Sequence, residues 1–359
     1  MKKTLLCIGA GKSQYPVILK AKELGYAVIA IDQNPSALGF KIADERVVLS
    51  TYDAPPLLDP INALSNKYNI IGILNRSSGP PVVTAARLAK LLQLPYYSED
   101  LAKKIVNKHL VMELCVKYGI PAPKSYAISK YEELNINKIQ YPCVVRPSLS
   151  LVGKSGITII NEENELDNAL VYAFDTTING YVTIDEYIRG DDVSLVSFVD
   201  GGELIPLCLL DEINTNDTNG KISGLGFAIP SIHDSSIVNK QVILSAQKIV
   251  DTFEIKRSSL MVSFRIDKNQ TPWLIEIHLD MGGDLLIEKL FPKALNYSFL
   301  EFTIKLLAGE NPAIPVVKIN PTAIIFDKGD DLVTDKKNTT FQAKDRMELD
   351  TLIYSSLAQ

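Results

Sequence analysis

The chain has 359 residues, of which 46% are hydrophobic and 22% are charged, so it holds enough apolar material for more than one core. Its formal net charge of -5 at pH 7 leaves no basic footprint, which argues against nucleic acid as a partner. No apolar run reaches the roughly 18 residues needed to span a bilayer. The four cysteines lack metal or redox spacing, so we expect reduced core residues in a cytoplasmic protein.

Residues 1–97 alternate between short apolar runs and helical patterns. Predicted strands lie at 4–8, 27–31, 45–49 and 70–74, and predicted helices lie at 14–24, 58–68 and from Pro80 or Pro81 onward. Strands that alternate with helices pair in parallel through right-handed crossovers. We therefore expect an N-terminal doubly wound parallel sheet, of Rossmann-like type, in this part of the chain.

The glycine turn from Gly9 to Ser13 follows the first strand and is open to several interpretations. A phosphate-binding P-loop needs a glycine where Leu6 stands, so this loop is too short to wrap a phosphate. A dinucleotide fingerprint lacks its third glycine at Gln14, although Asp32 suits a ribose, which keeps a nicotinamide oxidoreductase open. Otherwise the turn only allows close helix packing, or the helix N-terminus holds part of an anionic substrate.

A second candidate site follows the predicted strand at 70–74. Arg76 and Ser77 come at its carboxyl end, where open α/β sheets bind their ligands. Arg76 would supply a fixed positive charge and paired donors to a substrate. The alternative is a loop arginine that faces solvent.

The pattern changes after Pro95. One long helix is predicted over Ser98–Tyr118, and hairpins follow at 193–210 and at 260–277, with a helix at 237–253 between them. Strands that meet at hairpins are typical of antiparallel α+β structure. The segment after Pro315 contains one apolar strand, at Ala323–Phe326, and is otherwise unassigned.

Five segments in the second part resemble, in order, the motifs of the ATP-grasp superfamily. They are Asn107-Lys108 with Tyr118–Pro123, Tyr141–Pro147, Ser148–Gly156, Ile184–Asp192, and Trp273–His278 with Met281-Gly282-Gly283. The first domain resembles that of the biotin carboxylase and carboxyaminoimidazole ribonucleotide synthetase branch. The resemblance implies an α/β plus α+β protein in which a two-lobed ATP-grasp fold with antiparallel sheets follows the first domain. The expected units are residues 1–97, 98–190 (small lobe with linker helix), 191–312 (large lobe) and a C-terminal segment, 313–359.

The resemblance also implies roles for residues that bind the nucleotide. Lys108, Arg146 and Lys154 would neutralise ATP phosphates, and arginine stands at 146 where the family has lysine. The hinge would offer its backbone to adenine, and the following acid would hold the ribose. These hinge and ribose residues are Asp185, Glu186, Tyr187, Ile188 and Asp192.

The expected metal site departs from the family pattern. Glu276 matches one carboxylate of the family's metal site, but His278 replaces the family's asparagine. The second carboxylate is expected across the hairpin, where Ser263 and Phe264 stand instead, so this metal ligand is missing. Strand alternation places Glu276 and His278 on one face, and Asp280 could replace the lost charge. We expect Mg²⁺ or Mn²⁺ as the metal, with Mn²⁺ favoured by the imidazole.

Together these features predict an ATP-dependent ligase that releases ADP and joins a carboxylate to an amine through an acyl phosphate. Arg265 and Asp280 are the candidate catalytic residues, and Arg76, Ser77, Gly282 and Gly283 are the candidate substrate residues. The expected substrates are small molecules, an amino acid or related carboxylate and an amine, with neither nucleic acid nor membrane and with a homodimer left open. The alternatives are a nucleotide-binding protein impaired in catalysis and a carboxylase of a purine precursor.

Overall fold

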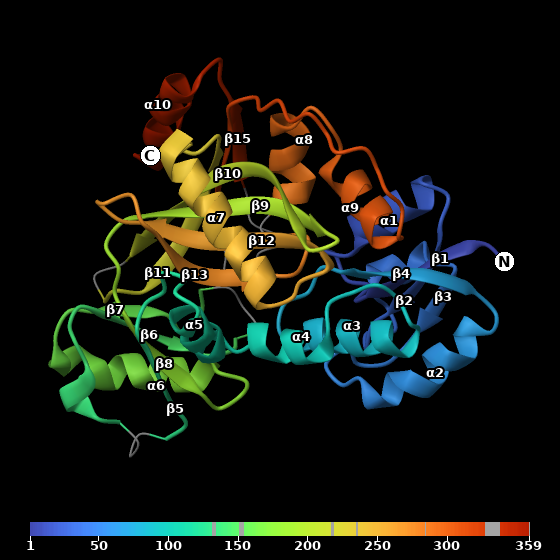
Figure 1. Cartoon of the computed structure of the whole chain (residues 1–359), viewed down its shortest axis with the longest axis horizontal. Coiled ribbons are helices and arrows are strands. Elements are labelled where there is room, and N and C mark those ends of the chain that lie inside the picture. Colours follow the sequence, from blue (N-terminus) through green and yellow to red (C-terminus); the bar gives the residue numbers. More distant parts are fainter. Residues whose placement is uncertain are drawn as a thin grey trace.

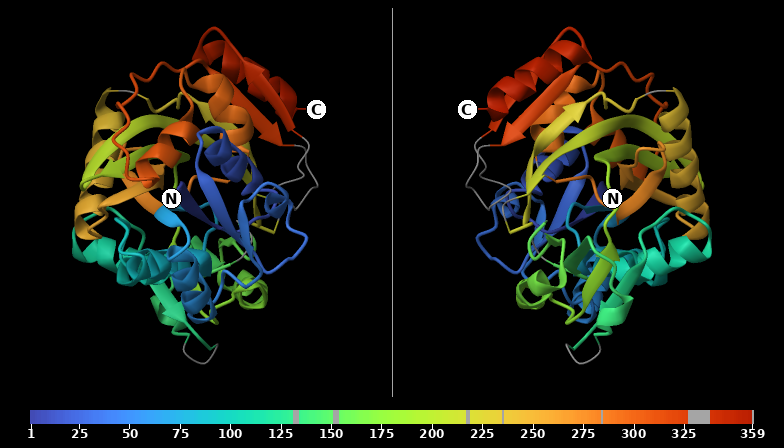
Figure 2. Two further views of the ribbon diagram at one scale, coloured as in Figure 1. Left: turned by 90° about the vertical axis from the view of Figure 1, so that its right-hand side faces the viewer. Right: turned by 90° about the vertical axis from the view of Figure 1, so that its left-hand side faces the viewer.

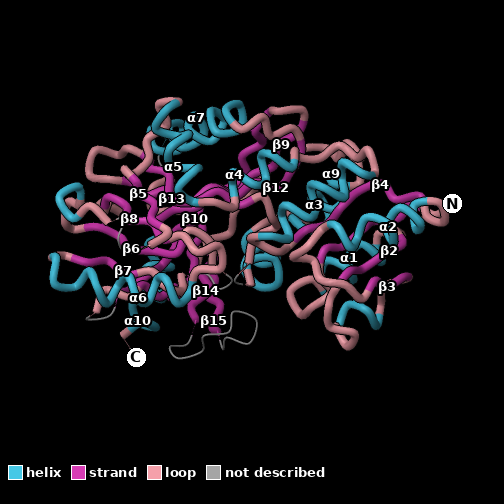
Figure 3. The backbone as a smooth tube through the Cα atoms, turned by 90° about the horizontal axis from the view of Figure 1, so that it is seen from below, coloured by secondary structure: helices cyan, strands magenta, loops and turns pink. Residues whose placement is uncertain are grey.

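We describe the protein from a computed structural model of the whole chain (Figure 1). The structure describes residues 1–130, 134–150, 154–216, 219–234, 236–283, 285–326 and 338–358. Figure 3 shows the N-terminal sheet at one end of the molecule and the sheet of the small lobe at the other, with the long strands of the large lobe between them.

The N-terminal unit is the parallel sheet expected from the sequence. Its strands lie in the order β3-β2-β1-β4, and all of their pairings are parallel. The bounds are β1 Lys3–Ile8, β2 Ala27–Ile31, β3 Glu45–Val47 and β4 Asn69–Asn75, with helices α1 Tyr15–Glu23, α2 Pro55–Ser65 and α3 Pro80–Leu91 and a short 3-10 helix at Leu38–Lys41. Helix α2 begins earlier than predicted because prolines suit the first turn of a helix, where no N–H is needed.

The two faces of this sheet are covered by helices from different parts of the chain. Leu6, Ile8, Ile29 and Ile31 pack against α2 and α3. On the other face, the side chains of β1 and β2 join a core that includes α1 and helix α9 (Phe299–Leu307). The close approach of α9 requires Gly72 on β4, because a Cβ there would meet the backbone oxygen of Leu307 at 2.2 Å. The first domain is therefore completed by a helix from the large lobe.

The small lobe consists of an antiparallel sheet covered by one helix. The strand order is β5-β8-β6-β7, and α6 packs on the sheet through Leu166, Ala169, Leu170 and Ala173. The bounds are β5 Ser125–Ile128, β6 Cys143–Pro147, β7 Thr158–Ile160, β8 Val182–Glu186 and α6 Leu166–Thr176, with 3-10 turns at Ile136–Lys138 and Glu163–Glu165.

The long helix predicted over 98–118 is in fact two helices, α4 (Glu99–Ile105) and α5 (Lys108–Lys117). Asn107 interrupts them with an extended backbone, φ -106° and ψ 100°, and its side chain donates to the carbonyl of Lys103. Asparagine favours such positions because its amide competes for backbone hydrogen bonds. The break places Lys108 at the first residue of α5.

The large lobe is built on a long antiparallel sheet in the order β13-β12-β9-β10-β11-β14-β15. One face packs against α4, α5 and α7, and the other faces the small lobe and the N-terminal domain. The bounds are β9 Asp191–Asp200, β10 Glu203–Asn216, β11 Ile222–Ile229, β12 Arg257–Ile266, β13 Pro272–His278 and α7 Ser236–Thr252, followed by a π-helical turn at Leu286–Leu290 and by α8 Phe291–Ala294.

The C-terminal segment, unassigned from the sequence, belongs to this same sheet. Strand β14 (Thr322–Phe326) pairs with β11, β15 (Asn338–Gln342) pairs with β14, and helix α10 (Arg346–Leu357) packs on them through Leu349 and Ile353. Figure 2 shows this strand and helix, in red, together at one edge of the molecule. In the described part of the chain, no helix combines the length and apolarity needed to cross a membrane. All four cysteines are buried and reduced, as expected.

Candidate active site between the two lobes

The face of the large sheet that looks toward the small lobe carries a row of polar side chains. Ser263 on β12 pairs with Glu276 on β13 and with Ser194 on β9, while Met261 pairs with His278. The strand register therefore confirms that Glu276 and His278 share one face, and that Ser263 occupies the position opposite Glu276. Ser194 and Ser263 are both buried.

Glu276 faces cationic groups from both lobes. Its Oε1 lies 3.0 Å from Lys108 Nζ, and its Oε2 lies 3.6 Å from Nε2 of His278. Burial alone would raise the pKa of the Glu276 carboxyl, but Lys108, His278 and Arg146 outweigh it and lower that pKa to about 2. The carboxylate is therefore ionised, and the positive groups beside it are placed where an anionic ligand would bind.

Arg146 ends strand β6 and is held by a buried acid. Its Nε lies 2.5 Å from Oδ2 of Asp185 on β8, and Ser125 donates to the other oxygen of that carboxylate. Asp185 sits between two paired strands, since it pairs with both Ser125 and Val144. The residue is therefore part of the sheet and its side chain positions Arg146. Its predicted role toward adenine stays a prediction.

The remaining hinge residues follow at the end of β8. The amide of Glu186 donates to the Lys124 carbonyl at 2.8 Å, and the amide of Tyr187 points to the Pro142 carbonyl at 3.4 Å. Ile188 is buried, and its carbonyl accepts a hydrogen bond from Arg265. The turn from Glu186 to Ile188 thus connects the two lobes, as a hinge must, and its role toward adenine stays a proposal.

Arg265, a candidate catalytic residue, is paired with an acid at the hinge. Its Nε and Nη2 bind the two carboxylate oxygens of Asp192 at 2.7 and 2.8 Å, and its guanidinium lies over the ring of Tyr187 at 5.3 Å. Asp192 also accepts from Asn214. The register explains this contact, because Arg265 on β12 pairs with Asp192 on β9. Its role in catalysis stays a prediction. Arg265 orders the hinge and the acid that we assigned to the ribose.

A carboxylate that the sequence did not single out lies beside Ser263. Glu212 on β10 accepts hydrogen bonds from Ser194 Oγ at 2.6 Å and Ser263 Oγ at 2.9 Å, and its other oxygen lies 3.4 Å from Lys154 Nζ. Burial would raise the pKa of Glu212, but Lys154, the two hydroxyls and His278 together lower it. A carboxylate from β10, which is separated from β12 by β9, thus contacts Ser263. No motif marks Glu212, since only the strand order brings it here.

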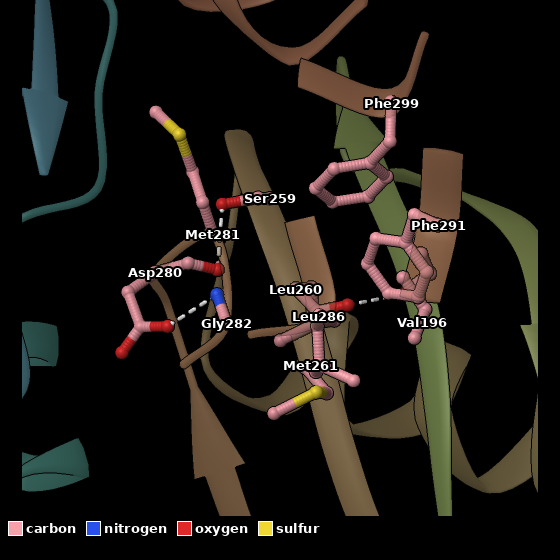
Figure 4. A pocket seen from close by; sticks show the side chains of 11 residues that line it. Val196, Ser259, Leu260, Met261, Asp280, Met281, Gly282, Leu286, Phe291 and Phe299 are labelled. Atoms are coloured by element: carbon pink, nitrogen blue, oxygen red, sulfur yellow. Dashed lines mark hydrogen bonds between the residues drawn. The ribbon is translucent and has the colours of Figure 1, made fainter. Parts of the chain in front are cut away.

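Asp280, the residue predicted to replace that charge, lies at the start of the glycine turn. Its Oδ1 accepts from the amide of Gly282 at 2.7 Å, and its carbonyl accepts from Ser259 (Figure 4). Asp280 therefore closes the glycine turn that follows β13, in which Gly282 has φ +81°. Beneath the turn lies a small pocket, of about 10 Å³, that is lined largely by Val196, Met261, Leu286, Phe291 and Phe299.

The structure brings the predicted substrate residues Arg76, Ser77 and Gly282 together, although the chain separates them widely. Arg76 Nε donates to the carbonyl of Gly282 at 3.0 Å, and its Nη2 binds Glu288 at 2.9 Å. Ser77 accepts from Gln14 at 3.1 Å. Arg76 is buried, so it is not the solvent-facing arginine of the alternative interpretation. Gly283 is exposed beside this cluster.

The donor groups fit a divalent metal that arrives with a nucleotide. Glu212, Glu276 and His278 lie on one sheet face and offer two ionised carboxylates and an imidazole. Across the described residues, however, no three His, Cys, Asp or Glu side chains are grouped closely enough to hold a metal alone. Further oxygen ligands, such as phosphate oxygens and water, would be needed to complete the coordination that Mg²⁺ or Mn²⁺ prefers.

Comparison with known proteins finds a family model that matches the middle of the chain, and several relatives. Residues 106–271 match the model of the phosphoribosylglycinamide synthetase ATP-grasp (A) domain. The carbamoyl phosphate synthase large chain of Clostridium acetobutylicum is 23% identical over 301 residues, 81% of this chain. The D-alanine–D-alanine ligase of Flavobacterium johnsoniae is 23% identical over 82% of this chain and 93% of its own.

Solved structures agree on the fold. The N5-carboxyaminoimidazole synthetase from Staphylococcus aureus complexed with ADP superposes with a TM-score of 0.78 at 15% identity, over 98% of this chain and 96% of that one. Curated relatives differ in size, since the chain spans 27% of the length of the carbamoyl phosphate synthase chain and less than half of two formyltransferases that it also matches.

Proposed function

We propose that this chain is a member of the ATP-grasp superfamily and an ATP-dependent ligase that releases ADP and joins a carboxylate to an amine, since residues 106–271 match an ATP-grasp domain model. The observation that carries the proposal is the meeting of the two lobes: Lys108, Arg146 and Lys154 come from the small-lobe side and face Glu212 and Glu276 of the large sheet. Such a cluster suits a triphosphate with a divalent cation, because positive groups and metal together neutralise its charge.

The reaction has two steps. An oxygen of the substrate carboxylate attacks the γ-phosphorus of ATP, the bond to the β,γ-bridging oxygen breaks, and ADP leaves with that electron pair. The amine nitrogen then attacks the acyl carbon, the carbon–oxygen bond to phosphate breaks, and the nitrogen loses a proton. Lys108, Arg146 and Lys154 would bind the phosphates and hold them in line with the carboxylate. A bound metal would neutralise charge on the phosphate oxygens.

The acceptor would bind where the glycine turn meets the N-terminal domain, near Ser77 and Gly283. Arg76 would border this site and hold Gly282 in place, since most of its donors are already engaged. We propose an amino acid or related small carboxylate as the acceptor. A D-alanine–D-alanine ligase among the relatives supports this class. The buried, reduced cysteines suit a cytoplasmic enzyme.

The arrangement also favours catalysis over the alternative of an impaired nucleotide-binding protein. That alternative was suggested by the missing carboxylate at Ser263, and Glu212 supplies a carboxylate in contact with Ser263. Both Glu212 and Glu276 are held ionised by nearby positive groups. The charge needed for a metal–triphosphate complex is therefore present.

The proposal is tested by an ADP-release screen over mixtures of carboxylates and amines, with Mg²⁺ and Mn²⁺ compared. We expect ADP release to require a carboxylate and to rise when an amine is added, and hydroxylamine to trap the acyl phosphate as a hydroxamate. Glu276→Gln should lose at least about 100-fold in rate, because it removes a charge beside the reacting phosphate. Glu203→Gln, on the exposed end of β10, is the control. AMP and pyrophosphate as products would contradict the mechanism, since they indicate adenylation.

A further inference from the structure

Two adjacent serines leave an unusual space on the active face of the large sheet. Ser194 on β9 and Ser263 on β12 are direct partners in the register, and their hydroxyls are 2.7 Å apart. Glu276 pairs with Ser263 from the other side. A larger side chain at either serine would fill the space between Glu276 and β10. The small residues therefore leave room above β9 and β12 for a side chain from elsewhere.

Glu212 occupies that room. It belongs to β10, which is separated from β12 by β9, yet its Oε1 lies within hydrogen-bond distance of the hydroxyls of both Ser194 and Ser263. Its side chain is only 14% exposed. A glutamate that crosses a neighbouring strand and accepts two hydroxyl donors has little rotational freedom left. Its carboxylate is therefore fixed against Ser263, the residue opposite Glu276.

The contacts of Glu212 do not resemble those of an ordinary structural ion pair. Among the described residues its one ion-pair partner is Lys154, at 3.4 Å, which also contacts the side chain of Asn214. Both serine donors bind the same oxygen, Oε1, which leaves the other oxygen, Oε2, with Lys154 alone among its described partners. Lys154 comes from the small lobe and is one of the residues that we assign to phosphate. Binding of a phosphate would give Lys154 a second anionic partner and would release part of Oε2.

We propose that Glu212 is the second metal-binding carboxylate of this protein and acts from β10 in place of the residue at position 263. The inference rests on the proposed function only in requiring that the site bind ATP with a divalent cation. In this arrangement Glu276 and Glu212 approach the metal from opposite sides of Ser263. The sheet would thus supply two carboxylates to the metal, Glu276 from the β12–β13 hairpin and Glu212 from β10.

The test is a titration of Mn²⁺ into the protein with the imido analogue of ATP, in which free Mn²⁺ is followed by electron paramagnetic resonance. Glu212→Gln should weaken Mn²⁺ binding by at least about tenfold, since an anionic ligand is lost. Glu203→Gln, on the same strand outside the site, should bind as wild type does. Binding of the analogue with EDTA present should be unchanged or tighter in Glu212→Gln, because a negative charge beside the phosphates is removed.

An exchange variant separates a metal ligand from a structural role. Glu212→Ser combined with Ser263→Asp moves the carboxylate onto β12 and should restore Mn²⁺ affinity to within about threefold of wild type. The exchange variant also tests whether Glu212 binds the metal if Glu212→Gln does not fold. If Glu212→Gln binds Mn²⁺ as tightly as wild type does, or if a folded exchange variant does not recover Mn²⁺ affinity, Glu212 is not a metal ligand. Either result leaves the proposed function standing. Wild-type protein that binds neither the analogue nor Mn²⁺ with it overturns the proposed function as well.

Discussion

At the residue scale, His278 is the side chain that we expect to affect the choice of metal most. It lies 3.6 Å from Glu276 and so borders the position expected for the ion. Imidazole is a better ligand for transition ions than for Mg²⁺, which prefers oxygen. We therefore predict higher activity with Mn²⁺ than with Mg²⁺ in the wild type.

The variant His278→Asn should shift this preference. An amide oxygen suits Mg²⁺, so the ratio of ADP-release rates with Mn²⁺ and Mg²⁺ should fall by about tenfold. His233→Asn is the matched control, because His233 bonds Asp191 at the edge of the sheet and does not contact Glu276. An unchanged ratio in His278→Asn would mean that the imidazole does not reach the metal.

At the scale of elements, the break between α4 and α5 sets the position of the small lobe relative to Glu276. Just after the break, His109 Nδ1 lies 3.1 Å from Ser148 Oγ, and the ring stacks on Tyr181 at 5.7 Å. Burial lowers the pKa of His109 below its usual 6.5, against smaller opposite effects of Glu113 and Asp185. The imidazole is therefore kept neutral at the junction of α5 with the small-lobe sheet.

This junction predicts a pH dependence of stability. With a lower pKa in the folded state, the unfolded chain binds the proton more readily, so stability is lost as pH falls from 6.5 through the folded-state pKa. His109→Gln should remove this part of the pH dependence, and the urea midpoints of wild type and variant should differ more at pH 7.5 than at pH 5.5. A difference that is equal at both values would show that His109 does not titrate differently on unfolding.

At the scale of the whole molecule, the N-terminal domain is joined to the large lobe by a buried ion pair and by helix α9. Arg76, with a side chain 3% exposed, binds Glu288, which is 24% exposed, and both flank the glycine turn. Removing one partner of a buried pair is costly because it leaves the other charge unpaired.

Arg76→Met should therefore lower the free energy of unfolding by about 3 kcal/mol, the lower end of the range for buried pairs, since Glu288 keeps some contact with water. Arg76→Met with Glu288→Leu should recover most of this loss. Chemical denaturation of both variants measures the effect, and Lys20→Met in the exposed Lys20–Glu23 pair should change stability by less than about 0.5 kcal/mol. A double variant no more stable than Arg76→Met would show that the pair does not join the domains.

The sequence by itself was sufficient for everything that depends on local period and spacing. Alternation of strands and helices predicts the parallel N-terminal sheet, and the period of two along β13 places Glu276 and His278 on one face, as the register confirms. The order of the motifs predicts an ATP-grasp protein, and residues 106–271 match the model of an ATP-grasp domain. These features need only neighbours along the chain, which a sequence shows directly.

Only the tertiary structure decided which distant side chains meet. The contact of Glu212 with Ser263 spans 51 positions, and that of Arg265 with Asp192 spans 73. The first depends on β9 lying between β10 and β12, and the second on the pairing of β9 with β12, an order that no local pattern encodes. The same holds for α9 on the N-terminal sheet and for β14 beside β11. Strand order and register arise from the packing of the whole chain, so residues with no motif of their own complete the site.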